Sequence, residues 1–227
     1  MDPVKITIFG LSGLLLLWLL TLVAYGVFGY RMWQLFGLLR QGRYENRFDH
    51  LGQRLGHMIK HVLLQPRIFN ERAIGLPHFL IFWGFMVYAT CFNWGLVRGL
   101  FPFLPVPYPD EVKVVSLFLE VFSVLVLISL GVAVARRLFF APKHLHLSLD
   151  ANLILGLIGL LMLSTVFGNA FRIVNEGGHT SAWTPFGSLL SKAFAATPPD
   201  TAHTLANAMW WLHMIVVLFF LVYLPYS

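Results

Sequence analysis

Residues 112–138 read VKVVSLFLEVFSVLVLISLGVAVARRL and decide the fold class of this chain. Apart from Lys113, Glu120 and an arginine pair near its end, the stretch holds only apolar and small residues. At a helical rise of 1.5 Å per residue, it is long enough to cross roughly 30 Å of hydrocarbon. Because backbone groups inside a bilayer have no water partner, such a stretch spans it as a helix. We therefore predict a membrane-spanning helix from about Val112 to Leu138.

Four further apolar runs of similar length occur along the chain, separated by short charged or Pro/Gly-rich stretches. They predict spans from about Ile8 to Phe28, Ile74 to Val97, Ala151 to Phe171, and Leu205 to Leu224. The first helix is expected to continue past Arg31 toward Leu39, where it leaves the lipid. The predicted fold class is all-α: an integral membrane bundle of five transmembrane helices that forms one membrane-embedded domain over residues 1–227.

Composition supports the same fold class. Hydrophobic residues make up 58% of the 227 and charged residues 11%, whereas about a quarter of the residues of a soluble domain are charged. The net charge of +6 does not indicate a nucleic-acid partner, because the basic residues are concentrated in particular connections. The single cysteine, Cys91, excludes a disulfide framework and a cysteine-based metal site within this chain. Iron–sulfur clusters are therefore expected only in a partner or in sequence beyond this stretch.

The distribution of basic residues orients the bundle. Positively charged residues favour the cytoplasmic side. The first and third connections carry Arg40, Arg43, Arg47, Arg54, Lys60, Arg67, Arg72, Arg136, Arg137 and Lys143. The second and fourth carry Arg98, Lys113, Arg172 and Lys192, offset by Asp110, Glu111, Glu176 and Asp200. We expect a multi-pass protein of the cytoplasmic (inner) membrane with its N-terminus outside and its C-terminus in the cytoplasm. We also expect it to be the N-terminal part of a longer chain or one subunit of a complex.

Residues 41–72 predict an amphipathic helix on the cytoplasmic surface, between the first two spans. Within FDHLGQRLGHMIKHVLLQ, at residues 48–65, apolar residues recur at helical spacing. His57 and His61 are four residues apart and so share one helix face. They form a weak alternative metal-ligand pair, and an ordinary solvated face is the competing interpretation.

Ionisable residues inside lipid are costly and therefore functional candidates. Few occur in the predicted spans: His78, Glu120 and His213. Neutral imidazole is a good axial ligand for haem iron, and helical bundles hold such cofactors between facing helices. We interpret His78 and His213 as haem ligands rather than as hydrogen-bonded core residues.

Three segments carry a resemblance to a known family: LPHFLIFWGF at residues 76–85, DEVK at 110–113, and WWLHMIVVLFFLVYLPYS at 210–227. Together with the five-span topology, they make the chain similar to the gamma subunit of respiratory nitrate reductase, a cytochrome b. It resembles still more the related membrane domain joined to cysteine-rich iron–sulfur proteins of the heterodisulfide reductase type. The similarity covers nearly the whole chain, and the segments around His78 and His213 are its most specific parts.

The resemblance implies two b haems, each held by one histidine of the second span and one of the fifth. His78 matches the ligand near the cytoplasm, and His213 matches a ligand of the outer haem. Tyr88 stands where the family has another histidine, and a fourth would fall just past Ser227. Three arrangements stay open: one haem bridging His78 and His213, an inner haem alone, or an inner haem with an outer haem held by His213.

The same resemblance implies a quinone site at the outer side. Lys113 matches a lysine that helps to bind quinol in the family, although a lysine at a span end often just snorkels to the headgroups. His203 is a candidate for exchanging protons with the quinone. Asp110 and Glu111 lie on the same predicted side and are further candidates for passing protons.

The predicted function is a membrane cytochrome b module of a quinone-linked oxidoreductase. It would carry electrons between the quinone pool, menaquinone or ubiquinone, and a cytoplasmic iron–sulfur or flavoprotein partner, through one or two haem b groups. The alternatives are a transporter without redox chemistry and a structural membrane anchor. A transporter predicts a polar path through several spans, and these helices offer few polar residues for one.

Overall fold

The structure is a computed structural model that describes residues 3–8, 10–43, 45–46, 48–70, 72–139 and 149–227. Arg47 and Lys143, two of the basic residues from which the orientation of the bundle is predicted, lie outside these ranges. The α-helices of the described residues are α1 (Gly13–Leu39), α2 (Leu51–Met58), α3 (Arg72–Leu100), α4 (Lys113–Phe139), α5 (Leu149–Asn175), α6 (Pro185–Ser191) and α7 (Pro199–Tyr223). All but α2 and α6 are long and apolar enough to cross a membrane, which confirms the five predicted spans.

The start of the first span differs from the prediction. Residues before α1 form a short antiparallel hairpin, β1 (Thr7–Ile8) and β2 (Leu11–Ser12), instead of a helix. Gly10 in this hairpin has a φ of +80°, a conformation that glycine adopts at no steric cost. The hydroxyl of Ser12 then accepts the N–H of Leu15 at 3.2 Å and caps the helix. Apolar residues alone do not reveal such a turn and cap.

The last two spans are longer than predicted at the ends that carry polar residues. Arg172, assigned from sequence to a connection, lies inside α5, which continues to Asn175. The helix α7 begins at Pro199, six residues before the predicted Leu205, because proline suits the first position of a helix. The connection between these helices also contains α6, a short helix that hydropathy does not reveal.

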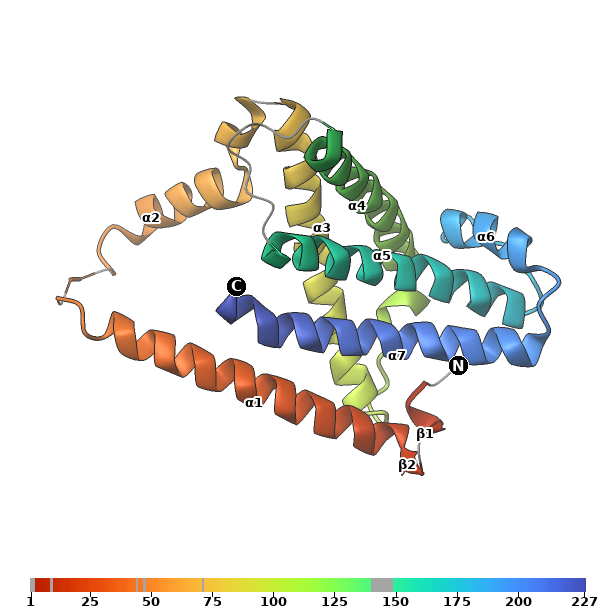
Figure 1. Ribbon diagram of the computed structural model, residues 1–227. Coiled ribbons are helices and arrows are strands. Elements are labelled where there is room, and N and C mark those ends of the chain that lie inside the picture. The colour runs from red at the N-terminus through yellow and green to blue at the C-terminus, as the bar shows by residue number, and fades with distance from the viewer. Residues whose placement is uncertain (1–2, 9, 44, 47, 71, 140–148) are drawn as a thin grey trace.

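The helices pack in two groups (Figure 1). The most extensive contact is between α5 and α7, with α1 against the other side of α7. The second group is α3 with α4, and α3 crosses behind α1, α5 and α7 in this view. One apolar core lies between α1, α3 and α7 around Leu17 and Met214, and another lies between α3, α4, α5 and α7 around Val126 and Leu161.

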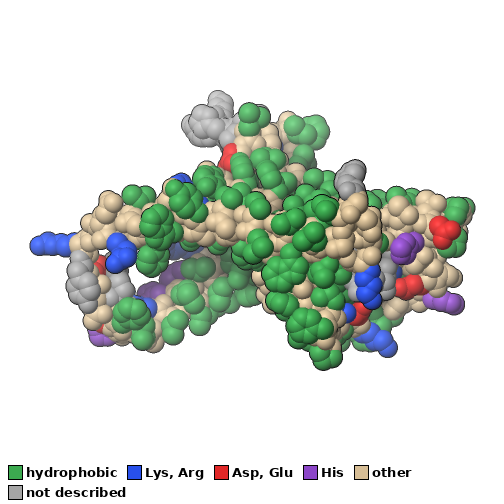
Figure 2. Space-filling model, turned by 90° about the horizontal axis from the view of Figure 1, so that it is seen from below, with side chains coloured by type: hydrophobic (Ala, Val, Ile, Leu, Met, Phe, Trp, Pro, Cys, Tyr) green, Lys and Arg blue, Asp and Glu red, His purple; other side chains and the backbone are tan. Residues whose placement is uncertain are grey.

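The predicted surface helix forms, and its α2 part stands away from the long helices (Figure 1), whereas Leu63 at its end accepts the indole N–H of Trp83 on α3 at 3.1 Å. It consists of α2 and a π-helical turn, Ile59–Leu63, and none of its residues is buried. On the face shown in Figure 2, hydrophobic side chains cover most of the middle and charged side chains gather mainly toward the two ends. This distribution suits a protein whose middle contacts lipid. The position of α2 on a membrane surface stays a prediction.

Candidate functional site

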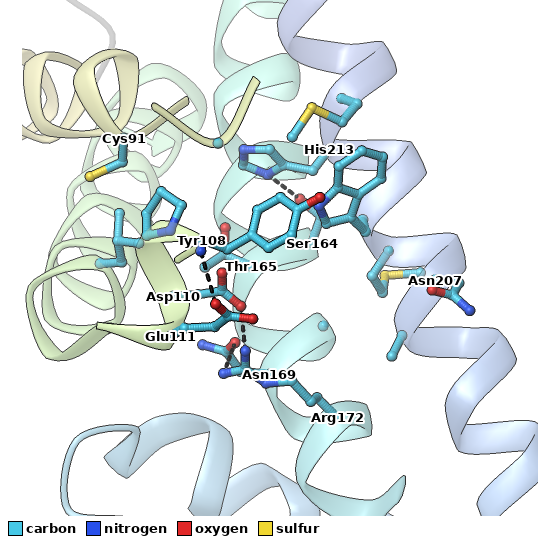
Figure 3. Close-up of a pocket in the computed structure, with 18 of the residues that line it drawn as sticks. Cys91, Tyr108, Asp110, Glu111, Ser164, Thr165, Asn169, Arg172, Asn207 and His213 are labelled. Carbon is cyan, nitrogen blue, oxygen red and sulfur yellow. Dashed lines mark hydrogen bonds and ion pairs between the residues drawn. The ribbon is translucent and has the colours of Figure 1, made fainter. Parts of the chain in front are cut away.

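A cavity of about 230 Å³ lies among α3, α4, α5, α7 and the connection that precedes α4 (Figure 3). Its walls combine aromatic, small and polar side chains. Its lining includes Tyr88, Cys91, Asp110, Glu111, Ser164, Asn169, Arg172, Asn207, Met209, Trp210 and His213. Ser164 and Arg172 mark two levels of the cavity, two helical turns or about 12 Å apart along α5.

His213 defines one level, which we call the His213 end. It lies near the middle of α7, and its Nδ1 is 2.9 Å from the hydroxyl oxygen of Ser164. The Ser164 hydroxyl donates its one proton to the backbone oxygen of Leu161, at 2.8 Å. The tautomer that satisfies both contacts carries its proton on Nδ1 of His213, which then donates to Ser164. This tautomer leaves Nε2 with a free lone pair, able to bind a metal or to accept a hydrogen bond.

Tyr88 lies beside His213 from α3, at the position where the resembled family has a histidine. The two ring centroids are 6.3 Å apart. The Tyr88 hydroxyl donates to the backbone oxygen of Leu119 at 2.9 Å and contacts the hydroxyl of Ser123. Its proton is therefore not available to a ligand in the cavity. Its polar atom thus fastens α3 to α4.

Charged groups define the other level, the Asp110 end. Arg172 on α5 forms an ion pair with Asp110 from the connection before α4. The guanidinium also donates from Nη2 to the Asn169 side-chain oxygen, at 3.3 Å. Glu111 accepts the backbone N–H of Tyr108 at 2.9 Å. Figure 3 shows these groups together, away from His213 and Ser164.

Asn207 contributes a further polar group to the wall. Its side chain is buried, and its Oδ1 accepts no hydrogen bond from any residue that the structure describes. Its Nδ2 lies 3.4 Å from Nδ1 of His203, one turn earlier on α7. His203, a predicted quinone residue, is exposed and reaches the cavity wall through this contact.

The structure does not bring the other predicted site residues into the cavity lining. Lys113 is the first residue of α4 and is exposed. His57 and His61 stack with ring centroids 5.7 Å apart on the isolated α2 segment, and both are exposed. Among the described residues, no group of three or more His, Cys, Asp or Glu side chains is placed to hold a metal ion. The roles predicted for these residues stay predictions.

A haem b can be tested against this geometry. His213 offers one imidazole with a free Nε2, but the ring beside it is Tyr88, whose hydroxyl is already bonded to α4. His78 is exposed, ten residues before Tyr88 on α3 and hence about 15 Å away along the helix. How these two imidazoles would share one or two haems stays a prediction. His78 and His213 each offer one imidazole, and the cavity lining supplies no second imidazole beside His213.

These features define the class of protein: a helical membrane module with a cavity among four of its long helices that is lined in part by ionisable residues. The chain is 26% identical over 220 residues to the probable iron-sulfur-binding oxidoreductase FadF of Bacillus subtilis, covering 96% of this chain and 31% of that protein. It is 24% identical over 227 residues to the EtfAB:quinone oxidoreductase of Syntrophomonas wolfei, covering 93% of this chain and 31% of that protein. The chain thus spans about a third of the length of these curated relatives. No family model and no solved structure matches it.

Residues that sequence reasoning missed complete the site. Ser164, Asn169 and Asn207 were not predicted, and Arg172 was used only to orient the bundle. Asn169 is a polar residue inside an apolar run, which is the one signal that marks it in the sequence. Ser164 has no such signal, because serine packs between membrane helices for many reasons.

Proposed function

We propose that this chain is the membrane module of a quinone-linked oxidoreductase. It would exchange electrons between a membrane quinone and an iron–sulfur or flavoprotein partner on the cytoplasmic side. The observation that carries the proposal is the cavity, which places an ionisable histidine near the middle of α7 and an ion pair about 12 Å away. The printed names of the two relatives, one an iron-sulfur-binding oxidoreductase and one a quinone oxidoreductase, support the same chemistry.

A quinone head group suits the cavity because its ring is flat and apolar, with an oxygen on either side. In the cavity wall, Oδ1 of Asn207 can accept a hydrogen bond from a quinol hydroxyl. Trp210 and Met209 in the wall offer apolar contact for the ring. Oxidation of a quinol releases two electrons and two protons. The electrons pass to the iron–sulfur or flavoprotein partner, and the protons need acceptors that reach water.

The Asp110 end can supply those acceptors. Asp110 and Glu111 are carboxylates in the cavity wall, and Asp110 is 42% exposed while it contacts Arg172. A carboxylate that borders both the cavity and solvent can take a proton from one and release it to the other. With the N-terminus outside, as the sequence predicts, this end faces the outer side of the cytoplasmic membrane.

The proposal includes haem b, for which His78 and His213 would each supply one axial imidazole. When bound, haem b supplies one-electron transfer between the two-electron quinone and the partner. The protein contributes Ser164, which holds the His213 ring in one tautomer, and an apolar surrounding from the helices.

A reduced-minus-oxidised visible spectrum of the protein purified from its native membranes tests this proposal. We expect a b-type difference band that appears on addition of a short-chain quinol. A transporter or a structural anchor predicts a colourless protein with no response to quinol. If a chemical reductant produces the b-type band and quinol does not, the haem part of the proposal stands and the quinone part is wrong.

A further inference from the structure

Glu120 is a buried carboxylate that the proposed chemistry does not use. It lies on α4, its side chain is 0% exposed, and it is not among the residues that line the cavity. A carboxylate without water is costly unless its oxygens accept hydrogen bonds. Those of Glu120 accept the backbone N–H groups of Phe186 and Gly187, at 2.8 and 3.1 Å, and the side-chain N–H of Asn169, at 2.9 Å.

Asn169 connects this carboxylate to the cavity. One end of its amide faces Glu120, which only accepts hydrogen bonds, and the other faces the Arg172 guanidinium, which only donates them. These two neighbours permit a single orientation of the amide, with Nδ2 toward Glu120 and Oδ1 toward Arg172. Arg172 in turn holds Asp110. A chain of three contacts therefore runs from Glu120 to Asp110.

We propose that Glu120 is a positioning residue for the ion pair of Asp110 and Arg172, and that this pair closes the Asp110 end of the cavity. Asp110 belongs to the connection before α4, whereas Arg172 belongs to the last turn of α5, so the pair joins two walls. If the Asn169 amide turned over, its NH₂ group would face the guanidinium, and Arg172 would lose an acceptor. The inference rests on the proposed function only in naming a quinone as the ligand that enters the cavity.

The substitution Glu120→Gln tests this role, because it replaces one accepting oxygen by a donating NH₂ group. If the NH₂ group faces Asn169, the Asn169 amide must turn over. If it faces Phe186 instead, the backbone N–H of Phe186 loses its acceptor. Cys91 lines the cavity, and its reaction with a water-soluble maleimide reports access without any ligand. In the full-length protein purified from native membranes, we expect Cys91 to react about tenfold faster in the variant, within the range of coupling in such networks. Mass spectrometry of the peptide that carries Cys91 measures the rate.

A second variant shows whether the effect travels through Asn169. Asn169→Leu cuts the chain of contacts, so adding Glu120→Gln to it should increase the labelling rate no further. Ser129→Ala is the control on the same helix, since this buried hydroxyl bonds only to the backbone of Leu125 among the described contacts. It should leave the rate unchanged. Glu120→Asp keeps a carboxylate that accepts hydrogen bonds, so its Cys91 labelling rate should stay close to that of the wild type.

Quinol kinetics separate this inference from the proposed function. In Glu120→Gln, the KM for a short-chain quinol should rise about tenfold while kcat changes less, because the substitution alters the shape of the cavity without removing a proton acceptor from its wall. Unchanged Cys91 labelling in both Glu120→Gln and Asn169→Leu, or additive effects of the two substitutions, overturns the positioning role. A wild-type protein that does not oxidise or reduce quinol refutes the proposed function, and the labelling experiment still decides the role of Glu120.

Discussion

The rings of Tyr88 and His213 face each other at 6.3 Å, with an angle of 36° between their planes, although they belong to α3 and α7. The resembled family has a histidine at the position of Tyr88. In this chain, the ring beside His213 is thus a phenol. The hydroxyl of that phenol is bonded to the backbone oxygen of Leu119.

Tyr88→His should create a site with two imidazoles. If His213 binds haem iron, we expect the variant to gain a six-coordinate low-spin signal in its visible and electron paramagnetic resonance spectra, because the new ring can supply the second axial bond. Tyr88→Phe keeps the ring without a ligand atom and should not gain it. Identical spectra of the two variants would place the iron elsewhere.

His78→Ala and His213→Ala should each reduce the haem content or convert haem to a high-spin form. Each substitution removes an axial imidazole, and no other imidazole lies beside either position among the described contacts. Haem stoichiometry and the difference spectrum measure the effect. The double variant His57→Ala/His61→Ala should keep the wild-type spectrum. A full spectrum in both single variants would contradict the ligand assignment.

Ser164→Ala should lower the free energy of unfolding by about 0.5–1.5 kcal/mol, because it removes the hydrogen bond between the Ser164 hydroxyl and the half-buried imidazole of His213. Thermal unfolding followed by circular dichroism measures this loss. Ser129→Ala removes a buried hydroxyl from a neighbouring helix without orphaning a partner and should cost less. Equal losses in the two variants would show that the bond from His213 to Ser164 contributes little.

The sequence predicted the long helices well because their length and apolarity follow directly from the thickness of a bilayer. It predicted their polar ends poorly. Arg172 looked like a loop charge because it follows the apolar run, yet it lies in α5 and pairs with Asp110, 62 residues earlier. Glu120 was recognisable as a buried ionisable residue, but its partners Asn169 and Gly187 come from distant segments. No local spacing encodes such contacts.

Gly187→Ala should destabilise the protein, because an added Cβ would lie 2.6 Å from the Glu120 Oε1 and 2.9 Å from the Asn169 Cβ. Both neighbours are buried, so the strain is expected to cost about 1–3 kcal/mol. Gly131→Ala is the matched control. Its Cβ would meet nothing within 4 Å, and the change should stabilise α4 by up to about 1 kcal/mol. Thermal unfolding compares the two, and a stable Gly187→Ala variant would show that α6 adjusts freely.

Lys113→Ala tests whether quinone contacts the exposed end of α4 or only the cavity. Lys113 is not a lining residue, but it lies two positions after Glu111, which is one. If its ammonium group stabilises charge on a quinone oxygen, the variant should keep its haem and be reduced more slowly by quinol.

A lysine that only snorkels to headgroups predicts a small change in stability and unchanged quinol kinetics. Lys113→Arg keeps the charge but changes its shape, and it separates a general electrostatic effect from a specific hydrogen bond. Unchanged rates in Lys113→Ala would remove this residue from the quinone site. If His203→Ala then slowed the reaction, the contact between His203 and Asn207 would mark where quinol enters, because it joins the exposed histidine to the cavity wall.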